Sequence, residues 1–209
     1  MIEELRKKLP AEEFDYLVLM DALKNYKKPR DKITQLLKTK SIIRVKKGIY
    51  IFGQKYRKGP VSLEVLANQI YGPSYISLEY ALSYHGLIPE RVQWVTSITS
   101  QKSKSFETPV GNFSYRHIHT GKYIVGVDDV QLDTYRFCLM ASPEKAIADI
   151  IAPMTDMINK ETVKEYLVDS MRIEPHELFQ LSVKRAEEIS KVYKNARVNY
   201  FLQFLKDSQ

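Results

Sequence analysis

The chain has 209 residues, of which 44% are hydrophobic and 27% are charged. That length fits one large domain or two small ones, and the apolar fraction excludes a largely disordered chain. No apolar run approaches the ~20 residues that cross a bilayer, and the first residues lack the apolar stretch of a signal peptide. The single cysteine, Cys138, excludes an internal disulfide and a cysteine zinc cluster. We therefore expect a cytoplasmic protein.

The excess positive charge is confined to the first part of the chain. Residues 1–60 hold 16 Lys and Arg against 7 Asp and Glu, a net charge of +9. Residues 61–209 hold 16 against 18, a net charge of −2. A basic block usually forms only a solvated surface, but one this lopsided, in a segment patterned to fold, indicates a polyanionic partner. We predict that the partner is nucleic acid.

Two helices are predicted in this basic part. Asp15 is a suitable N-cap for a helix over residues 16–26. Pro29 suits the first turn of a second helix, which extends to about residue 38. On a helical wheel the outer face of the second helix is polar. The predicted inward-facing residues of the two helices are Leu17, Leu19, Met20, Leu23, Ile33, Leu36 and Leu37.

A hairpin is predicted after the second helix, because two β-rich runs, 42–45 and 49–52, flank a Lys-Lys-Gly turn. Helix, turn, helix and hairpin is the order of a winged helix-turn-helix, in which the second helix enters a major groove. The alternative is a small module that serves only for packing, but the polar outer face of the second helix favours DNA binding. We expect Thr34 and Gln35 to contact base edges and Lys46 and Lys47 to contact phosphates. The candidate DNA-binding residues are Lys28, Arg30, Lys32, Thr34, Gln35, Lys38, Arg44, Lys46, Lys47, Lys55, Arg57 and Lys58.

The rest of the chain predicts a larger mixed α/β domain that ends in helices. Ser142 and Pro143 form a strong helix start. The fold class is therefore α+β, with domains at residues 1–58 and 59–209. Helices are predicted over residues 63–70, 77–84, 143–151, 160–168, 175–182 and 183–205, and strands over 94–99, 106–108, 112–118, 123–127 and 136–141.

Residues with chemical potential are few in this second domain. His117 and His119 would share one face of a strand, but a metal site needs further ligands that the spacing does not select. Cys138 sits in a buried-looking strand as a small hydrophobe. Phosphate-binding glycine loops, the HExxH zinc motif and the GxSxG nucleophile motif are all absent from the sequence. We expect no enzyme activity, no catalytic residues, no cofactor and no metal.

Seven segments of the chain carry motifs that can be compared with known families: PRDKIT (29–34), RVKKGIY (44–50), YGPSYISLE (71–79), YHGLIPE (84–90), FETP (106–109), GNFSYRHI (111–118) and ASPEKA (141–146). Together these segments resemble AbiEi-type antitoxins of abortive-infection, type IV toxin–antitoxin systems. The resemblance covers about residues 14–152, and the helices after residue 158 carry no matching motif. One departure is Lys40-Ser41, where the resemblance leads us to expect glycine between the second helix and the hairpin.

The resemblance implies a winged-helix repressor of its own toxin–antitoxin operon, whose second domain counteracts a nucleotidyltransferase-like toxin. Its partners would be double-stranded DNA at its own operator and a cognate toxin, which a type IV antitoxin need not bind directly. The alternative is a stand-alone transcription factor whose second domain senses a small ligand. A toxin gene directly downstream would separate these two. A nucleotidyl-transfer or RNA-processing enzyme would need clustered acids for Mg²⁺, which we do not find in the sequence.

Overall fold

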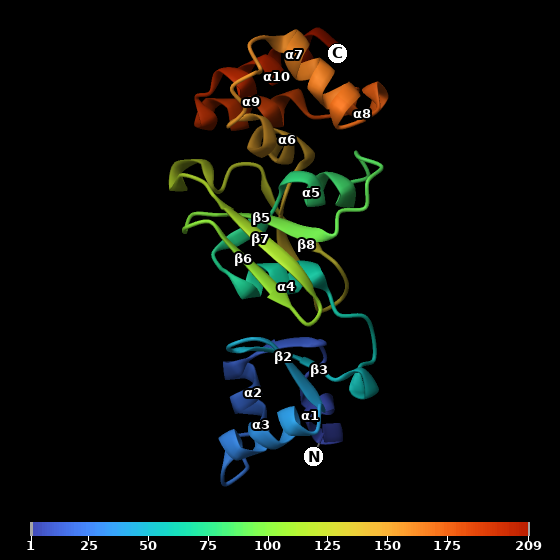
Figure 1. The fold of residues 1–209 in the computed structure, drawn as a ribbon, viewed down its shortest axis with the longest axis vertical. Coiled ribbons are helices and arrows are strands. Elements are labelled where there is room, and N and C mark those ends of the chain that lie inside the picture. The colour runs from blue at the N-terminus through green and yellow to red at the C-terminus, as the bar shows by residue number, and fades with distance from the viewer. Residues whose placement is uncertain (1, 209) are drawn as a thin grey trace.

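The computed structural model describes residues 2–208 and has a mixed α+β fold. These residues form ten α-helices and two β-sheets. The molecule is elongated: the first 52 residues form one end, a large sheet lies in the middle, and the last helices cover the other end (Figure 1).

A three-stranded antiparallel sheet organises the N-terminal end, with the strand order β1-β3-β2. The helices around it share a core with the hairpin, formed by residues such as Leu5, Leu19, Leu23, Ile33, Leu36 and Phe52. The elements are α1 (Ile2–Lys8), β1 (Glu13–Asp15), α2 (Tyr16–Ala22), α3 (Pro29–Lys38), β2 (Ile42–Lys46) and β3 (Ile49–Phe52). The sequence analysis missed α1 and β1, which are short and rich in charge.

Both predicted helices of this part are present. The backbone N–H of Val18 donates to Asp15 Oδ1 at 2.8 Å, which confirms the cap of α2. Pro29 is the first residue of α3, as predicted. The prediction for Leu17 is wrong, because its side chain is 75% exposed. The buried residues of α2 are instead Leu19 and Ala22, and Leu23, which follows the helix as its C-cap, is also buried.

The predicted hairpin is confirmed, but it lies between two hydrophobic cores. One face of β3 places Tyr50 and Phe52 in the N-terminal core. Its other face places Ile49 and Ile51 in the core of the second part of the chain, together with Val45 of β2. A strand buried on both faces needs a continuous apolar run instead of an alternating one. This explains why all four residues of β3 are buried.

The turn between α3 and β2 occurs without the expected glycine. Lys40 has φ 53, in the left-handed region where glycine is favoured. The backbone of Gly53 passes so close to this turn that a Cβ there would lie 2.0 Å from the carbonyl oxygen of Lys40. The geometry therefore requires glycine at the end of the hairpin, at residue 53.

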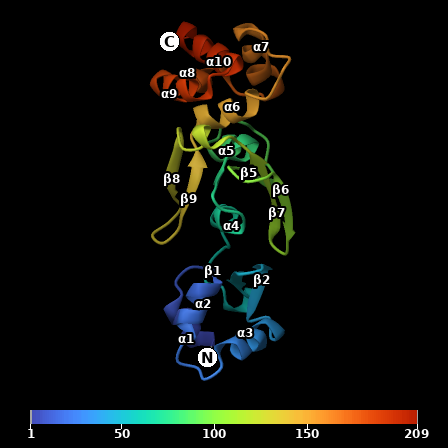
Figure 2. The ribbon, with the colours of Figure 1, turned by 90° about the vertical axis from the view of Figure 1, so that its left-hand side faces the viewer.

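A six-stranded mixed sheet forms the middle of the molecule, with the order β6-β7-β5-β4-β9-β8. β4 and β9 pair at only one position, Ile76 with Met140. Because this pairing is so short, the two halves of the sheet diverge, and α4 (Leu63–Ile70) lies between them (Figure 2). The strands are β4 (Ser74–Ile76), β5 (Trp94–Thr99), β6 (Lys104–Thr108), β7 (Gly111–His117), β8 (Val127–Gln131) and β9 (Phe137–Ala141).

The remaining helices pack on one end of this sheet. The side chain of Ser142 accepts a hydrogen bond from the backbone N–H of Lys145, which confirms the predicted cap. Every residue from Glu144 to Ile151 is buried. The helices are α5 (Leu78–Tyr84), α6 (Pro143–Ile151), α7 (Lys160–Glu165), α8 (Pro175–Phe179), α9 (Val183–Tyr193) and α10 (Ala196–Ser208). Short turns of other helix types are η1 (Gln54–Tyr56), η2 (Thr120–Lys122) and η3 (Tyr166–Ser170).

Two predicted elements of this part are wrong. Residues 123–126 form a turn and not the predicted strand: β8 begins only at Val127, because Gly126 at φ 81 turns the backbone first. The helix predicted over residues 183–205 is broken, because Lys194 adopts a left-handed φ of 47. The side chain of Asn195 then accepts the backbone N–H of Arg197 at 2.9 Å and begins α10.

Candidate functional site

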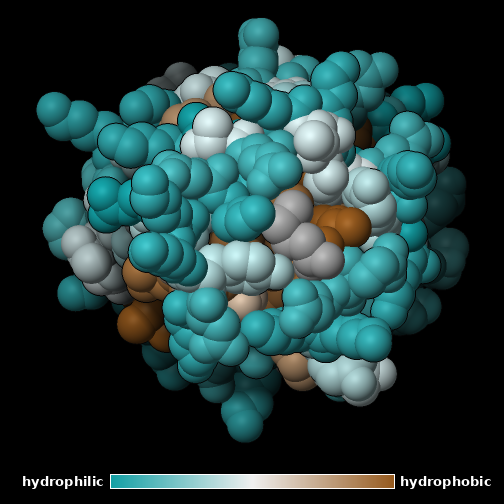
Figure 3. Space-filling model, turned by 90° about the horizontal axis from the view of Figure 1, so that it is seen from below, coloured by the Kyte–Doolittle hydropathy of each residue, from teal (hydrophilic) through white to brown (hydrophobic). Residues whose placement is uncertain are grey.

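The predicted DNA-contacting helix, α3, presents a polar face to solvent. It buries Ile33 and Leu36 against the N-terminal core and leaves Arg30, Thr34, Gln35 and Lys38 exposed. The helix lies at the end of the molecule farthest from the C-terminal helices (Figure 1). Seen from below, this end is covered mainly by hydrophilic side chains (Figure 3).

The polar groups of this face have few partners among the described residues, and those few are local. The hydroxyl of Thr34 donates to the carbonyl of Arg30 at 3.1 Å. The ammonium of Lys32 donates to Gln35 Oε1 at 3.3 Å and lies 5.6 Å from the centre of the Tyr26 ring. Among the described residues, no carboxylate lies within ion-pair distance of the basic groups of Lys28, Arg30 and Lys38. The ion pairs of the described residues join other side chains: Arg6–Glu12, Lys24–Asp21, Arg136–Glu13, Arg136–Asp133, Lys145–Asp149, Lys160–Asp207, Arg172–Glu90, His176–Glu177, Arg185–Asp128 and Lys206–Glu187.

The hairpin turn points in a direction that the sequence did not predict. Lys46 donates to the carbonyl of Ile70, the last residue of α4, at 2.5 Å. Its ammonium also lies 4.3 Å from the centre of the Phe106 ring. Burial, followed by the nearby charge of Lys104, lowers the pKa of Lys46. The prediction that Lys46 contacts phosphate is therefore corrected: it holds the hairpin turn against α4.

The other predicted residues remain accessible to different degrees. Lys47 is exposed at the turn, and Arg44 is exposed on β2 with its guanidinium 5.8 Å from the Tyr50 ring. Lys55, Arg57 and Lys58 belong to the connection between β3 and α4. In this connection Arg57 donates to the carbonyl of Phe52 at 2.8 Å. The structure thus groups Lys28, Arg30, Lys32, Thr34, Gln35 and Lys38 on α3 and its N-terminus, and leaves the others apart from it.

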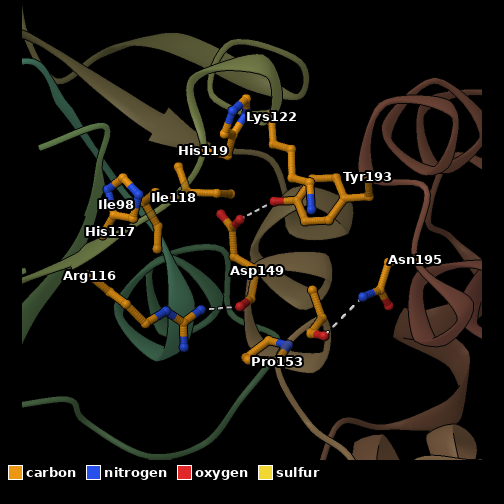
Figure 4. Close-up of a pocket in the computed structure, with 11 residues that line it drawn as sticks. Ile98, Arg116, His117, Ile118, His119, Lys122, Asp149, Pro153, Tyr193 and Asn195 are labelled. Atoms are coloured by element: carbon orange, nitrogen blue, oxygen red, sulfur yellow. Dashed lines mark hydrogen bonds between the residues drawn. The ribbon is translucent and has the colours of Figure 1, made fainter.

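A second candidate site lies in the other half of the molecule. A cavity of about 370 Å³ opens between the end of β7 and helices α6 and α9 (Figure 4). Arg116, His117, His119 and Lys122 line one side of it. Asp149 of α6 and Tyr193 of α9 line the other. His119 lies after the end of β7, so the prediction that both histidines share a strand is wrong, although both reach the same cavity.

The carboxylate of Asp149 at the floor of this cavity is fully occupied. The hydroxyls of Tyr75 and Ser77 donate to Oδ2 at 3.0 and 2.7 Å. The phenol of Tyr193 donates to Oδ1, and the ammonium of Lys145 lies 3.5 Å from the same oxygen. Burial, followed by the charge of Asp149, raises the pKa of both tyrosines, so the phenols stay protonated and keep donating.

Lys145 connects this floor to the rim. Its ammonium is completely buried and donates to Tyr193 Oη at 2.7 Å and to the backbone carbonyl of Lys122 at 2.6 Å. Burial lowers the pKa of Lys145, and the charge of Asp149 opposes that shift. This network was not predicted from the sequence. The available signal was a Lys and an Asp four residues apart in a helix whose residues between and after them are apolar.

Neither the thiol nor the histidines form a recognisable catalytic or metal-binding set. Cys138 is buried, and burial, followed by the charge of Glu64, raises its pKa to about 12, so the thiol stays protonated. Across residues 2–208 no three His, Cys, Asp or Glu side chains gather as metal ligands. In the same range, no helix has the length and apolar content to cross a bilayer.

Comparison with models of known protein families finds no match, and comparison with curated proteins finds no relative. The assignment of a function to either site therefore depends on the geometry of the site and on the chemistry of its residues.

Proposed function

We propose that residues 2–52 form a winged helix-turn-helix that binds duplex DNA, with α3 as the recognition helix. The observation that carries this proposal is the exposed face of α3, which combines unpaired basic groups with two polar side chains able to contact bases. The whole excess positive charge of the chain lies in residues 1–60, which contain this helix.

In this proposal the residues of α3 divide between two roles. Lys28, Arg30 and Lys38 contact phosphates and fix the position of the helix on the duplex. Gln35 and Thr34 face the base edges, where the amide of a glutamine can bond both N6 and N7 of adenine. Lys46 takes no part, because its ammonium is held by α4. Arg44 on β2 is the hairpin residue best placed to reach a neighbouring phosphate.

The biological role that we propose is repression of the protein's own toxin–antitoxin operon, as the resemblance to AbiEi-type antitoxins implies. The second part of the chain would then counteract a nucleotidyltransferase-like toxin without necessarily binding it. Growth of cells that co-express the chain with the product of the gene directly downstream tests this role.

The test of DNA binding is the substitution Gln35→Ala in the full chain. A duplex is first selected from a random library with the wild-type protein, and affinities are measured by fluorescence anisotropy. We expect a loss of ~1–3 kcal/mol on the selected duplex and little change on random duplex. Gln180→Ala, an exposed glutamine after α8, is the matched control. If Gln35→Ala weakened both duplexes by the same factor, α3 would not read bases through this residue.

A second candidate function is a DNA-binding regulator that responds to a small ligand. The cavity between β7 and α9 favours it, because a hollow of about 370 Å³ lies within the usual size range of ligand sites. An operon without a toxin gene would favour this candidate over the antitoxin role.

A further inference from the structure

We propose that the cavity between β7, α6 and α9 binds a phosphate monoester of a small molecule. This inference does not depend on DNA binding, because the whole site lies outside residues 1–60 and its occupancy can be measured by itself.

The rim of the cavity carries positive charge. The guanidinium of Arg116 donates to the backbone carbonyl of Asp149 and has no carboxylate partner among the described residues. The ammonium of Lys122 lies 5.4 Å from the centre of the Tyr193 ring, also without an acidic partner in the described part of the chain. Two cations thus flank the cavity without an ion-pair partner among the described residues (Figure 4).

The carboxylate of Asp149 at the floor of the cavity cannot neutralise the cations of the rim. Both oxygens of Asp149 already face donors, from Tyr75, Ser77, Tyr193 and Lys145. Its charge is balanced by the buried ammonium of Lys145. The carboxylate therefore neither neutralises the rim nor offers a free oxygen to a cation. The electrostatics of the cavity favour an anionic ligand.

The cavity also presents hydrogen-bond donors to a ligand. The backbone N–H of Gly121 donates to His119 Nδ1 at 3.2 Å, so the neutral ring carries its proton on Nε2 and remains a donor. Lys145 fixes the backbone of Lys122 through the 2.6 Å bond to its carbonyl. A phosphoryl group offers three acceptor oxygens, and the planar guanidinium of Arg116 suits such a group.

The size and the apolar lining of the cavity indicate what the rest of the ligand is. Ile98 and Ile118 on the strand side and Pro153 after α6 also line the cavity. A volume of about 370 Å³ exceeds what a bare phosphate fills and lies at the lower end of ligand pockets. The ligand that fits both features carries one phosphoryl group on a small organic body.

The experiment uses the full chain and three probes: inorganic phosphate, adenosine 5′-monophosphate and adenosine. Isothermal titration calorimetry and thermal unfolding report binding. We expect both phosphate-containing probes to bind and to raise the unfolding midpoint, with the nucleotide binding more tightly, because a ligand of the folded state stabilises it. Adenosine should do neither. Equal binding of adenosine and the nucleotide, or no binding of either phosphate probe, would overturn the proposal.

Lys122→Gln is the informative variant, since the ammonium of Lys122 forms no ion pair with the described residues and lies 5.4 Å from the centre of the Tyr193 ring, so its loss should not unfold the chain. We expect it to weaken nucleotide binding by about tenfold, the usual effect of losing one charge-assisted hydrogen bond. Lys184→Gln, an exposed lysine of α9, is the control and should bind normally. Unchanged affinity in Lys122→Gln would contradict the assignment. A 5′-phosphorylated duplex that displaces the nucleotide would identify a nucleic-acid end as the source of the phosphate, and failure to displace it would identify a free metabolite.

Discussion

At the scale of single residues, the pair Lys145 and Asp149 has the strongest energetic consequence. Both side chains are fully buried, with 3.5 Å between Nζ and Oδ1. Removing one partner from a buried ion pair leaves an unpaired charge, which costs more than the pair itself contributes. The other partners of the Lys145 ammonium, Tyr193 Oη and the carbonyl of Lys122, are neutral and cannot replace the lost charge.

We predict that Asp149→Asn lowers the free energy of unfolding by roughly 3–5 kcal/mol, because the ammonium of Lys145 stays buried without its counterion. Urea unfolding followed by circular dichroism measures the change. Adding Lys145→Met to this variant should restore part of the loss. Lys191→Met on the exposed face of α9 is the control. No recovery in the double variant would show that the hydrogen bonds to Asp149, and not its charge, stabilise this site.

At the scale of elements, the hairpin shows a change of role between sequence and structure. Its strands and turn were predictable, because their apolar runs and turn residues are local signals. Its orientation was not, because the contact between Lys46 and Ile70 joins residues 24 positions apart. A basic turn residue looks the same in the sequence whether it faces phosphate or a helix terminus.

We expect Lys46→Ala to lower the free energy of unfolding by ~1–2 kcal/mol, through the lost hydrogen bond to Ile70 and the lost contact with the Phe106 ring. Thermal or urea unfolding of the full chain checks this. Lys47→Ala, at the neighbouring exposed position, should leave the unfolding free energy unchanged. Equal stability of the two variants would mean that the ammonium of Lys46 is not held by α4.

Other features of the fold were likewise predictable only where the sequence carries a local signal for them. The caps at Asp15 and Ser142 were predictable and are confirmed by their hydrogen bonds. The break at Lys194 was missed, because nothing in its neighbourhood marks a lysine for the left-handed conformation. The network around Asp149 was missed for a different reason: it joins β4, α6 and α9, and no local pattern reports on side chains that meet only in the folded chain.

At the scale of the whole molecule, the two halves share structure across their junction. Val45, Ile49 and Ile51 of the hairpin contribute to the core of the second half. A fragment that ends at residue 60 would expose these three side chains to water. DNA binding by the N-terminal half is therefore best measured on the full chain with substitutions on α3.

A buried glutamate makes this junction sensitive to pH. Glu13 of β1 accepts the backbone N–H of Ser62 and lies 3.5 Å from the guanidinium of Arg136, which in turn donates to the carbonyl of Pro60 at 2.9 Å. The second oxygen of Glu13 is buried without a hydrogen-bond partner among the described residues. Burial raises the pKa of Glu13 above its ordinary value of 4.5, and the Ser62 bond and Arg136 only partly oppose it.

The raised pKa of Glu13 determines how the stability of the protein changes with pH. The folded state holds the proton of Glu13 more tightly than the unfolded state does. The resulting stabilisation is therefore complete below pH 4.5 and is lost as the pH rises through the raised pKa. Glu13→Gln cannot titrate, so we predict that the wild type loses stability relative to this variant as the pH increases. Urea unfolding of both proteins at several pH values above 4.5 measures the difference. Glu107→Gln, an exposed glutamate of β6, should follow the wild type at every pH. If the unfolding free energies of the wild type and Glu13→Gln changed in parallel with pH, Glu13 would titrate alike in the folded and unfolded chain. This residue would then make no pH-dependent contribution to stability.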